Sequence, residues 1–326
     1  MDYVTDDDKL LIVEDLKTYF VTKQGIVRAV DGVSFSVNRG EIVGLVGESG
    51  CGKSMTSFSI LRLVPQPAGK IINGRIIFRQ ENLLDKTEEE MRKIRGNRIS
   101  MIVQDAMVSL NPLLKVGYQL AEPLRYHNKV MDSLKDMCIS LLARVKVPAP
   151  ESRIRDYPFQ FSGGMCQRTL IAMGISCDPD LLIADEPTTA LDVTIQAQIL
   201  KLLQEIRKEF NSSIIFITHD LAVVAQLCSR VMVMYAGRIV EKADIMTFFK
   251  KPAHPYSRGL IESVPVLKKR VDRLYTIDGH PPSLFKLPPG CRFAPRCTQA
   301  KGICAEEYPP EYILEDGHVV SCWLYE

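Results

Sequence analysis

The sequence predicts an α/β fold with a mostly parallel sheet, an antiparallel β region, an inserted helical subdomain and an irregular C-terminal extension. Three observations predict it. Strand-like and helix-like segments alternate over residues 181–241, residues 116–173 have apolar side chains at helical spacing, and proline recurs after Lys250. Because alternating strands and helices build covered parallel sheets, the core is expected to be of that kind.

The N-terminal hundred residues are expected to form strands around one helix. Apolar runs bounded by turn residues mark each strand, and the turn Asn-Arg-Gly at residues 38–40 separates the first two. The expected strands cover residues 32–37, 41–46, 74–78 and 99–103. A helix is expected at residues 55–63.

The α/β pattern resumes after the helical segment, which is interrupted by prolines at 148 and 150. The expected strands are residues 181–184, 213–218, 231–235 and 238–241, the last two joined by an Ala-Gly turn, and the expected helices are residues 192–210 and 220–228. The prolines of the tail include Pro252, Pro255, Pro265, Pro281, Pro282, Pro288 and Pro289. We therefore predict a core of residues 1–104 and 178–250, a helical subdomain of residues 105–177 and an extension of residues 251–326.

Composition excludes several classes of protein. The chain has 326 residues, 46% hydrophobic and 25% charged, with a formal net charge of +2. These are values of an ordinary globular protein, and they give no basic field for nucleic acid. No apolar run approaches the roughly 20 residues that span a bilayer. The acidic N-terminus lacks a secretory signal, so we expect a cytosolic protein that can dock on a membrane protein.

The stretch at residues 47–54 reads Gly-Glu-Ser-Gly-Cys-Gly-Lys-Ser, the pattern of a phosphate-binding P-loop. An apolar run precedes it and a helical run follows, so a chance glycine turn is the weaker interpretation. Glycines let backbone N–H groups face an anion, Lys53 reaches the β- and γ-phosphates, and the Ser54 hydroxyl binds Mg²⁺. The residues expected to bind nucleotide and Mg²⁺ here are Ser49, Gly50, Cys51, Gly52, Lys53, Ser54 and Met55.

Polar residues that follow other predicted strands could complete a hydrolytic site. Asp185 ends a buried strand, where P-loop enzymes hold Mg²⁺, and Glu186 could act as general base on the attacking water. His219 could face the γ-phosphate, and Gln104 could contact Mg²⁺ or water. Each alone has a structural alternative, since solvated acids and lone histidines are common at strand ends.

A second glycine motif lies before the helix expected at residues 169–175. Residues 161–168 read Phe-Ser-Gly-Gly-Met-Cys-Gln-Arg. Ser162 suits a helix N-cap, and the glycines leave the helix N-terminus open to an anion. The two roles are compatible.

Taken in this order, the motifs resemble the ATPases of ATP-binding cassette (ABC) transporters over about residues 10–250. The P-loop matches the family pattern. So do Gln104 as the Q-loop glutamine, Asp185 as the Walker B aspartate, Glu186 as the catalytic glutamate and His219 as the switch histidine. Residues 161–165 resemble the Leu-Ser-Gly-Gly-Gln signature, with Phe161 for leucine and a Met165 that is common in peptide importers. Residues 189–192, Thr-Ala-Leu-Asp, resemble the D-loop.

The resemblance implies a head-to-tail pair of ATPase domains. Each ATP then lies between one P-loop and the signature of the other subunit, so Ser162, Gly163, Gly164 and Met165 would contact the partner's ATP. Arg155 and Gln160 would approach its sugar or base. Tyr19 and Phe20 compete for the aromatic position that stacks on adenine. Cys166 occupies a position where a basic residue is frequent, which puts a charge contact there in doubt.

Four of the nine cysteines crowd into the tail with the spacing C-x5-C-x6-C-x17-C. Cys291, Cys297, Cys304 and Cys322 could hold a [4Fe–4S] cluster or a zinc ion. The wide gaps favour iron–sulfur over zinc, and four unconnected buried cysteines are the remaining alternative. Residues 251–256 and 291–297 resemble the C-terminal region of dipeptide and oligopeptide importer ATPases, some of which carry such a cluster.

The resemblance therefore implies an ATP-hydrolysing subunit that powers import of dipeptides or oligopeptides from the cytoplasmic face of a bacterial membrane. Implied partners are a second ABC ATPase, favoured as a heterodimer, two integral-membrane permeases and, indirectly, an extracytoplasmic peptide-binding protein. Importers of nickel, glutathione or another small solute stay open. From other classes, a soluble non-transport ABC ATPase and an iron–sulfur-regulated sensor ATPase also stay open.

Overall fold

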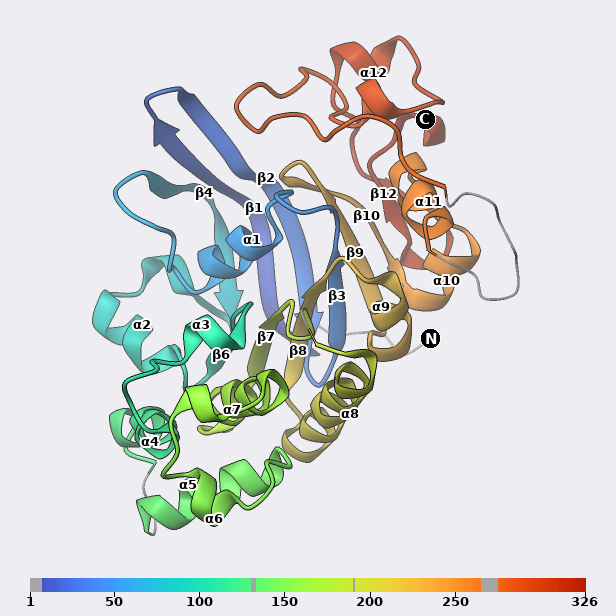
Figure 1. Cartoon of the computed structure of the whole chain (residues 1–326). Coiled ribbons are helices and arrows are strands. Elements are labelled where there is room, and N and C mark those ends of the chain that lie inside the picture. The colour runs from blue at the N-terminus through green and yellow to red at the C-terminus, as the bar shows by residue number, and fades with distance from the viewer. Residues whose placement is uncertain (1–7, 130–132, 190, 265–274) are drawn as a thin grey trace. The chain divides into compact units, whose positions relative to one another are not determined.

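The structure is a computed structural model that describes residues 8–129, 133–189, 191–264 and 275–326 (Figure 1). Ala190 of the predicted D-loop, Pro265 and the acidic residues 1–7 lie outside the described residues. The chain forms two compact units. The first contains residues 38–41 and 85–216 with the N-terminal residues to Leu10, and the second contains residues 11–37, 42–84 and 217–326.

The first unit joins three strands to a group of helices. Its strands lie in the order β8-β7-β6, and β6 and β7 are parallel, with Ile102 beside Ala184. Helices α4, α5 and α7 pack on one another, as the green ribbons of Figure 1 show. The elements are α2 (Glu88–Ile94), β6 (Ile99–Ile102), α3 (Ala106–Ser109), α4 (Val116–Tyr126), α5 (Leu134–Arg144), α6 (Pro150–Arg153), α7 (Gly163–Ile175), β7 (Leu181–Asp185), α8 (Val193–Phe210) and β8 (Ser213–Thr218), whose last two residues enter the second unit.

The second unit contains an antiparallel sheet of order β2-β1-β4-β5. Its strands are β1 (Lys9–Thr22), β2 (Gly25–Asn38), β4 (Gly69–Phe78) and β5 (Glu81–Asn82). The pairing of β1 with β4 is irregular between Glu14 and Thr18. Gly74 lies opposite this bulge with φ 113°, and a Cβ there would lie 2.7 Å from the Glu14 carbonyl oxygen. Only glycine fits that close approach of two backbones.

A second sheet of this unit has the order β11-β12-β10-β9-β3. β3 (Ile42–Val46) is buried along its whole length and pairs in parallel with β9 (Arg230–Tyr235), which turns at Ala236 and Gly237 into the antiparallel β10 (Arg238–Asp244). Both turn residues have positive φ, as two-residue hairpins of this kind need. Helices α1 (Lys53–Ile60) and α9 (Leu221–Leu227) belong to the same unit.

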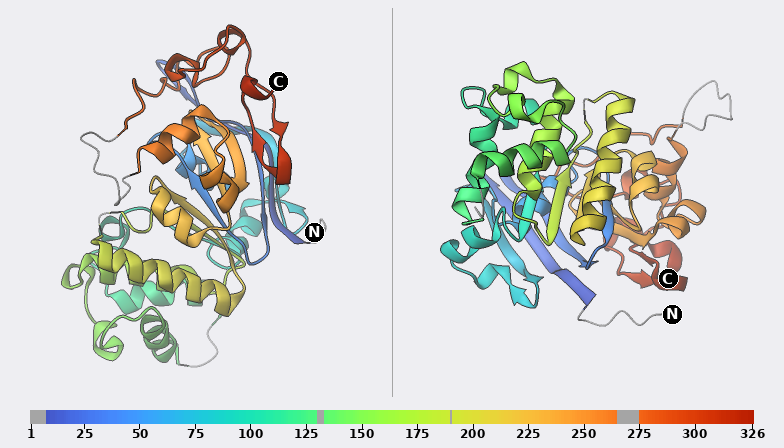
Figure 2. Two further views of the ribbon diagram at one scale, coloured as in Figure 1. Left: turned by 90° about the vertical axis from the view of Figure 1, so that its right-hand side faces the viewer. Right: turned by 90° about the horizontal axis from the view of Figure 1, so that it is seen from below.

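The extension follows α10 (Ile245–Lys250) and contains only short elements. These are α11 (Pro255–Glu262), α12 (Ile303–Glu306), β11 (Tyr312–Ile313) and β12 (Val319–Val320). β12 pairs with β10, so the red C-terminal strands of Figure 2 lie against the orange hairpin. Within the described residues of the extension no helix exceeds eight residues, as its proline content predicts.

The structure confirms most of the predicted elements and corrects some bounds. The α/β fold with mixed sheets is present, and the Ala-Gly hairpin is where the sequence places it. β1 was not predicted, β2 begins seven residues before the expected start at residue 32, and β4 begins at Gly69 rather than Gly74. The helix expected at residues 169–175 begins earlier, at Gly163. No helix among the described residues is long and apolar enough to cross a membrane.

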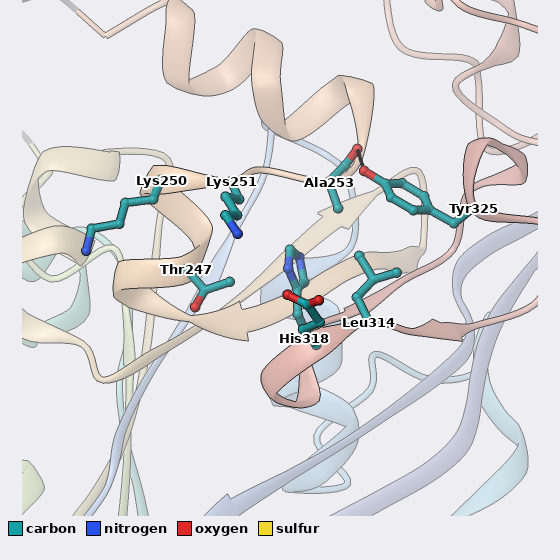
Figure 3. A pocket seen from close by; sticks show the side chains of 8 residues that line it. Thr247, Lys250, Lys251, Ala253, Leu314, His318 and Tyr325 are labelled. Carbon is teal, nitrogen blue, oxygen red and sulfur yellow. Dashed lines mark hydrogen bonds between the residues drawn. The ribbon is translucent and has the colours of Figure 1, made fainter.

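A buried polar cluster fixes the extension to β10. The Glu241 carboxylate is 1% exposed and accepts hydrogen bonds from the backbone N–H groups of Ala253 (2.8 Å) and His254 (2.7 Å). His318 lies 2.8 Å from it through Nε2 and also lines a pocket with Ala253 and Tyr325 (Figure 3). Burial opposes the charge of Glu241, but these hydrogen bonds outweigh burial and lower its pKa.

His254, the N-cap residue of α11, should make the stability of the protein sensitive to acid. Burial lowers the pKa of His254 from 6.5 to about 4, while its Nδ1 accepts a hydrogen bond from the Tyr256 N–H (3.1 Å). Between pH 6.5 and pH 4, His254 is therefore protonated in the unfolded chain but neutral in the folded chain. The free energy of unfolding should therefore fall as pH drops from 6.5 towards 4, by at most about 1.4 kcal/mol per pH unit.

The variant His254→Asn keeps an acceptor for the Tyr256 N–H but cannot titrate. Urea unfolding at pH 7 and pH 5 should show a smaller loss of stability for the variant than for the wild type. An equal loss in both proteins would contradict this role of His254.

Candidate functional site

The P-loop is a tight turn between β3 and α1 in which two glycines are sterically required. A Cβ on Gly47 would lie 2.2 Å from the Met234 carbonyl oxygen, and one on Gly52 would lie 2.2 Å from that of Ala29. Gly52 is also the N-cap of α1 and offers no side-chain cap. The first N–H groups of the helix therefore stay available to an anion, as the sequence predicts for residues Lys53, Ser54 and Met55.

Lys53 is folded back onto the loop that carries it. Its side chain is buried, and Nζ donates to the carbonyl oxygens of Gly47 (2.8 Å) and Glu48 (3.0 Å). Ser49 and Gly50 are exposed at the tip of the loop. Cys51 is buried in the loop with its sulfur 3.9 Å from Lys53 Nζ, and burial raises the pKa of its thiol. Cys51 is therefore a packing residue of the loop and not a reactive thiol.

His219 lies beside the start of the P-loop. A cavity of about 290 Å³ is lined by His219, Gly47, Glu48, Leu260, Tyr275 and Ile277, among others. The structure thus brings the predicted switch histidine and the P-loop together within the second unit. It also shows that residues of the extension line the same cavity, which the sequence did not indicate.

Tyr19 and Phe20 point to opposite faces of β1, because side chains alternate along a strand. The neighbouring Thr18 contacts α1 through Ser59 Oγ (2.7 Å), so Phe20 shares the face of α1. Tyr19 donates from its hydroxyl to Asp31 Oδ1 (2.5 Å), and burial followed by this carboxylate raises the pKa of Tyr19 to about 12. That one of these two rings stacks on adenine stays a prediction, and both residues stay candidates.

In the first unit, the predicted hydrolytic residues meet at the carboxyl ends of β6 and β7. The two strands are parallel neighbours, so the residues after them share one edge. Gln104 Nε2 donates to Glu186 Oε2 (3.3 Å), and Thr189 Oγ1 donates to the same oxygen (2.9 Å). Asp185 is buried at the end of β7, whereas Glu186 has φ 46° and turns the chain out of the strand. Two neighbouring carboxylates can thereby serve different roles.

The signature forms the N-terminus of α7. Ser162 is the N-cap, and its Oγ accepts from the Met165 N–H (3.3 Å). Arg155 and Gln160, which precede this helix in the sequence, are exposed, and the side-chain Oε1 of Gln160 accepts from the Tyr157 N–H (2.9 Å). The predicted residues are therefore presented on an accessible surface of the first unit.

Cys166 does not take part in this surface. It is fully buried, and its thiol lies 3.6 Å from the Pro158 carbonyl oxygen. The nearby Arg168 is also buried and donates to the Val145 carbonyl oxygen (2.6 Å) and to Gln198 Oε1 (2.8 Å). The basic residue of this helix therefore ties α7 to its neighbours.

The four C-terminal cysteines gather in one part of the extension as free thiols. Burial raises the pKa of Cys291 to about 11, with further contributions from Cys304 and Cys322. Burial likewise raises the pKa of Cys322, to which Cys297 and Cys304 contribute. Yet among the described residues no group of three His, Cys, Asp or Glu side chains is arranged to hold a metal ion. The sulfur donors are neighbours, but the structure gives the predicted cluster no preformed site.

Comparison with known proteins identifies the family. Residues 30–189 match the model of the ABC transporter family, and residues 240–304 match that of the oligopeptide/dipeptide transporter C-terminal region. A dipeptide transport ATP-binding protein of Bacillus subtilis is 51% identical over 320 residues, covering 98% of this chain and 96% of the relative. An oligopeptide transport ATP-binding protein of Escherichia coli is 47% identical over 317 residues, covering 97% and 93%.

The chain belongs to the oligopeptide/dipeptide family of ABC transporter ATP-binding proteins.

Solved structures of the cassette agree with this assignment of the fold. A dimeric ATP-binding cassette in a post-hydrolysis state with ADP and Pi has a TM-score of 0.65 at 25% identity, covering 72% of this chain and 98% of that chain. A component of an ABC transporter complex from Clostridium perfringens has a TM-score of 0.63 at 27% identity, covering 75% and 92%.

Two arginines of the extension of this ABC ATPase contact the P-loop and β2, and the sequence did not indicate them. Arg296 forms a bidentate ion pair with Glu48 of the P-loop, and Arg292 is paired with Asp31 of β2. Both lie in the Cys-Arg-Phe-Ala-Pro-Arg-Cys stretch at residues 291–297, for whose arginines the sequence suggested no role. The sequence signal was the presence of two arginines in a segment that is otherwise apolar. Because buried arginines require partners, such a segment predicts ion pairs with another part of the chain.

A cavity of about 500 Å³ lies among Thr247, Lys251, Leu314 and His318 (Figure 3). None of the predicted nucleotide residues lines it, so we give it no part in the ATP site of the ABC ATPase.

The signature glycines provide a matched pair of variants. A Cβ on Gly164 would lie 2.9 Å from Ile195 Cγ2 of α8, whereas a Cβ on Gly163 would meet Leu191 only at 4.0 Å. We expect Gly164→Ala to lower the free energy of unfolding by about 1–3 kcal/mol through overpacking. Gly163→Ala should change it by less than about 0.5 kcal/mol.

Urea unfolding of the two variants and the wild type tests the difference. Equal stability of Gly163→Ala and Gly164→Ala would show that α7 and α8 are not packed as closely as the structure has them.

Proposed function

We propose that this chain is an ATP-hydrolysing subunit that powers import of dipeptides or oligopeptides through a pair of membrane permeases. The observation that carries the proposal is the P-loop, with Lys53 held inward and the uncapped N-terminus of α1 turned to an anion, in a chain of this family. The place of action would be the cytoplasmic face of a bacterial membrane, where the protein docks peripherally.

The proposed chemistry divides roles among named residues. Lys53 would move from the loop carbonyls to the β- and γ-phosphates, and the backbone N–H groups around Gly50 and Gly52 would surround them. Ser54 and Asp185 would hold Mg²⁺, which neutralises developing charge when it is bound. Glu186 would take a proton from the attacking water. Its carboxylate accepts hydrogen bonds from Gln104 and Thr189, and both of these orient the Oε2 atom.

His219 would contact the γ-phosphate from the second unit. Its place on the cavity beside Gly47 supports this role. Tyr19 or Phe20 would stack on adenine. Phosphoryl transfer needs positioning and charge neutralisation more than covalent chemistry by the protein, and this set of residues supplies both.

The signature would act on a nucleotide bound by a second ABC ATPase. Ser162 is exposed, and Gly163, Gly164 and Met165 are half-buried at a helix N-terminus that suits a phosphate; Arg155 and Gln160 lie next to it in sequence. We favour a homologous but different partner subunit, as the resemblance to dipeptide and oligopeptide importer ATPases implies. An extracytoplasmic peptide-binding protein would supply the permeases with solute.

Peptides are the proposed solutes because the match to the oligopeptide/dipeptide C-terminal region covers residues 240–304. Nickel, glutathione and other small solutes are the alternatives, since an ATPase subunit need not touch the solute. A soluble ABC ATPase without a permease and an iron–sulfur-regulated sensor are the alternatives from other classes.

We further propose that residues 251–326 form a functional extension of a core made of residues 1–104 and 178–250, with residues 105–177 as the signature subdomain. Its four cysteines would hold a [4Fe–4S] cluster, with Zn²⁺ as the alternative. The mutual effect of the thiols on their pKa values supports their proximity, and sulfur is the donor that both groups prefer. Binding would have to draw the thiols together.

Replacement of Glu186 by Gln tests the hydrolytic proposal. The amide keeps the shape but cannot accept the water proton, so ATP should still bind while turnover falls by about 10²-fold or more. Binding is measured by calorimetry and turnover by phosphate release. Turnover near the wild-type rate would remove Glu186 from the proposed role.

Purification from native membranes tests the transport proposal. Recovery with two permease subunits and a homologous ATPase is the expected result. A complex that contains no membrane protein would favour the soluble alternative.

Iron and acid-labile sulfide analysis of anaerobically purified protein tests the cluster. About four irons and four sulfides per chain are expected for a [4Fe–4S] group. Zinc without sulfide would establish the alternative, and a turnover that changes on oxidation would favour the sensor.

A further inference from the structure

The loop from Cys291 to Cys297 reaches the P-loop through Arg296. Nη1 donates to Glu48 Oε2 (2.8 Å) and Nη2 to Glu48 Oε1 (3.1 Å), which is a fork-to-fork pair. The Arg296 side chain is only 5% exposed. Bidentate geometry fixes the direction of the carboxylate as well as its position, which a single point charge does not.

The extension also holds the backbone of the same P-loop residue. The N–H of Glu48 donates to the hydroxyl of Tyr256 (2.9 Å), which is fully buried in α11. The Tyr256 ring packs against Tyr235 (4.6 Å between centroids) and Phe293 (5.5 Å). Glu48 is thus fixed by its side chain and its main chain to two different segments of the extension.

The opposite end of the loop contacts β2, the strand beside the one that carries Tyr19 and Phe20. Arg292 is buried and donates to Asp31, and it also donates to the Ala236 carbonyl oxygen. Asp31 in turn accepts from the Tyr19 hydroxyl. One short loop therefore contacts both the phosphate side and the Tyr19 side of the proposed ATP site.

Glu48 connects these contacts to Lys53. Its carbonyl oxygen accepts from Lys53 Nζ (3.0 Å), as does that of Gly47. The residue whose carbonyl group binds Lys53 is therefore the one whose side chain binds Arg296 and whose N–H binds Tyr256. A change in the Glu48 backbone would move the carbonyl oxygens that bind Lys53 and the first N–H groups of the loop.

We propose that Arg292 and Arg296 form an arginine clamp, a pair of positioning residues through which the extension sets the affinity of the P-loop for MgATP. The clamp rests on the proposed function, because it acts on the nucleotide site. It gives the extension a role in nucleotide binding. The role belongs to the arginines between the cysteines and requires no metal.

Double-mutant cycles in calorimetric titrations with MgATP test the clamp. All proteins carry Glu186→Gln, so that ATP is not consumed. Arg296→Gln and Glu48→Gln should each raise Kd about tenfold, which corresponds to about 1.4 kcal/mol. The double variant should be no weaker than either single variant, because both changes remove one interaction. Arg296→Lys should recover only part of the affinity, since it lacks the fork.

A matched control separates positioning from folding of the extension. Arg258 donates to the Pro252 carbonyl oxygen and to Tyr325, both within the extension. Arg258→Gln should lower the unfolding midpoint while Kd stays within about twofold of the reference protein. In proteins with Glu186 intact, Arg296→Gln should raise KM for ATP and leave kcat within about twofold.

The outcomes distinguish the two proposals. If the reference protein binds MgATP, Lys53→Ala abolishes binding and Arg296→Gln binds like the reference, the clamp is wrong and the proposed function stands. Additive effects in the cycle, or an equal rise in Kd for Arg258→Gln, would also overturn the clamp. If the reference protein does not bind MgATP, the proposed function itself fails.

Discussion

The close approach of backbones around the P-loop is the constraint on which the second unit depends. Gly47 and Gly52 lie against the carbonyl groups of Met234 and Ala29, where no side chain fits. The Gly237 N–H donates to the Cys51 carbonyl oxygen (2.7 Å), so the β9–β10 turn is attached to the same loop. Strand β3, the loop and α1 are thereby locked to β2 and β9. The orientation of the loop N–H groups follows from this packing.

Local features of the fold were predictable because each depends on neighbours in sequence. Buried apolar runs gave β3, β7 and β8, and side-chain caps marked helix starts. Ser162, Asp192 and Asp220 each accept a hydrogen bond from the first turn of the helix that follows. The P-loop could be recognised because its glycines and lysine fall within eight residues, although the backbones that require Gly47 and Gly52 come from distant residues. The family assignment rested on such local motifs and was confirmed.

Features that depend on distant partners were not predictable. Glu48 occupies a variable position of the P-loop pattern, and its ion pair with Arg296 joins residues 248 positions apart. Strand β1 was missed because its apolar alternation is interrupted by the bulge near Asp15, which only the pairing with β4 explains. Cysteine spacing could suggest a cluster, but the distances between thiols are set by the packing of loops. The four thiols are neighbours, as their spacing suggested, but among the described residues they do not form a metal site.

The hydrogen bonds of Lys53 within the loop have a further consequence. Its ammonium group has two carbonyl acceptors, those of Gly47 and Glu48. An arriving phosphate therefore exchanges one set of hydrogen bonds for another, and the gain in free energy is the difference between the two sets. Such a loop should therefore bind an anion of single charge poorly, because that anion offers few charged oxygens in exchange for the two carbonyl groups. A polyphosphate with its metal ion offers several.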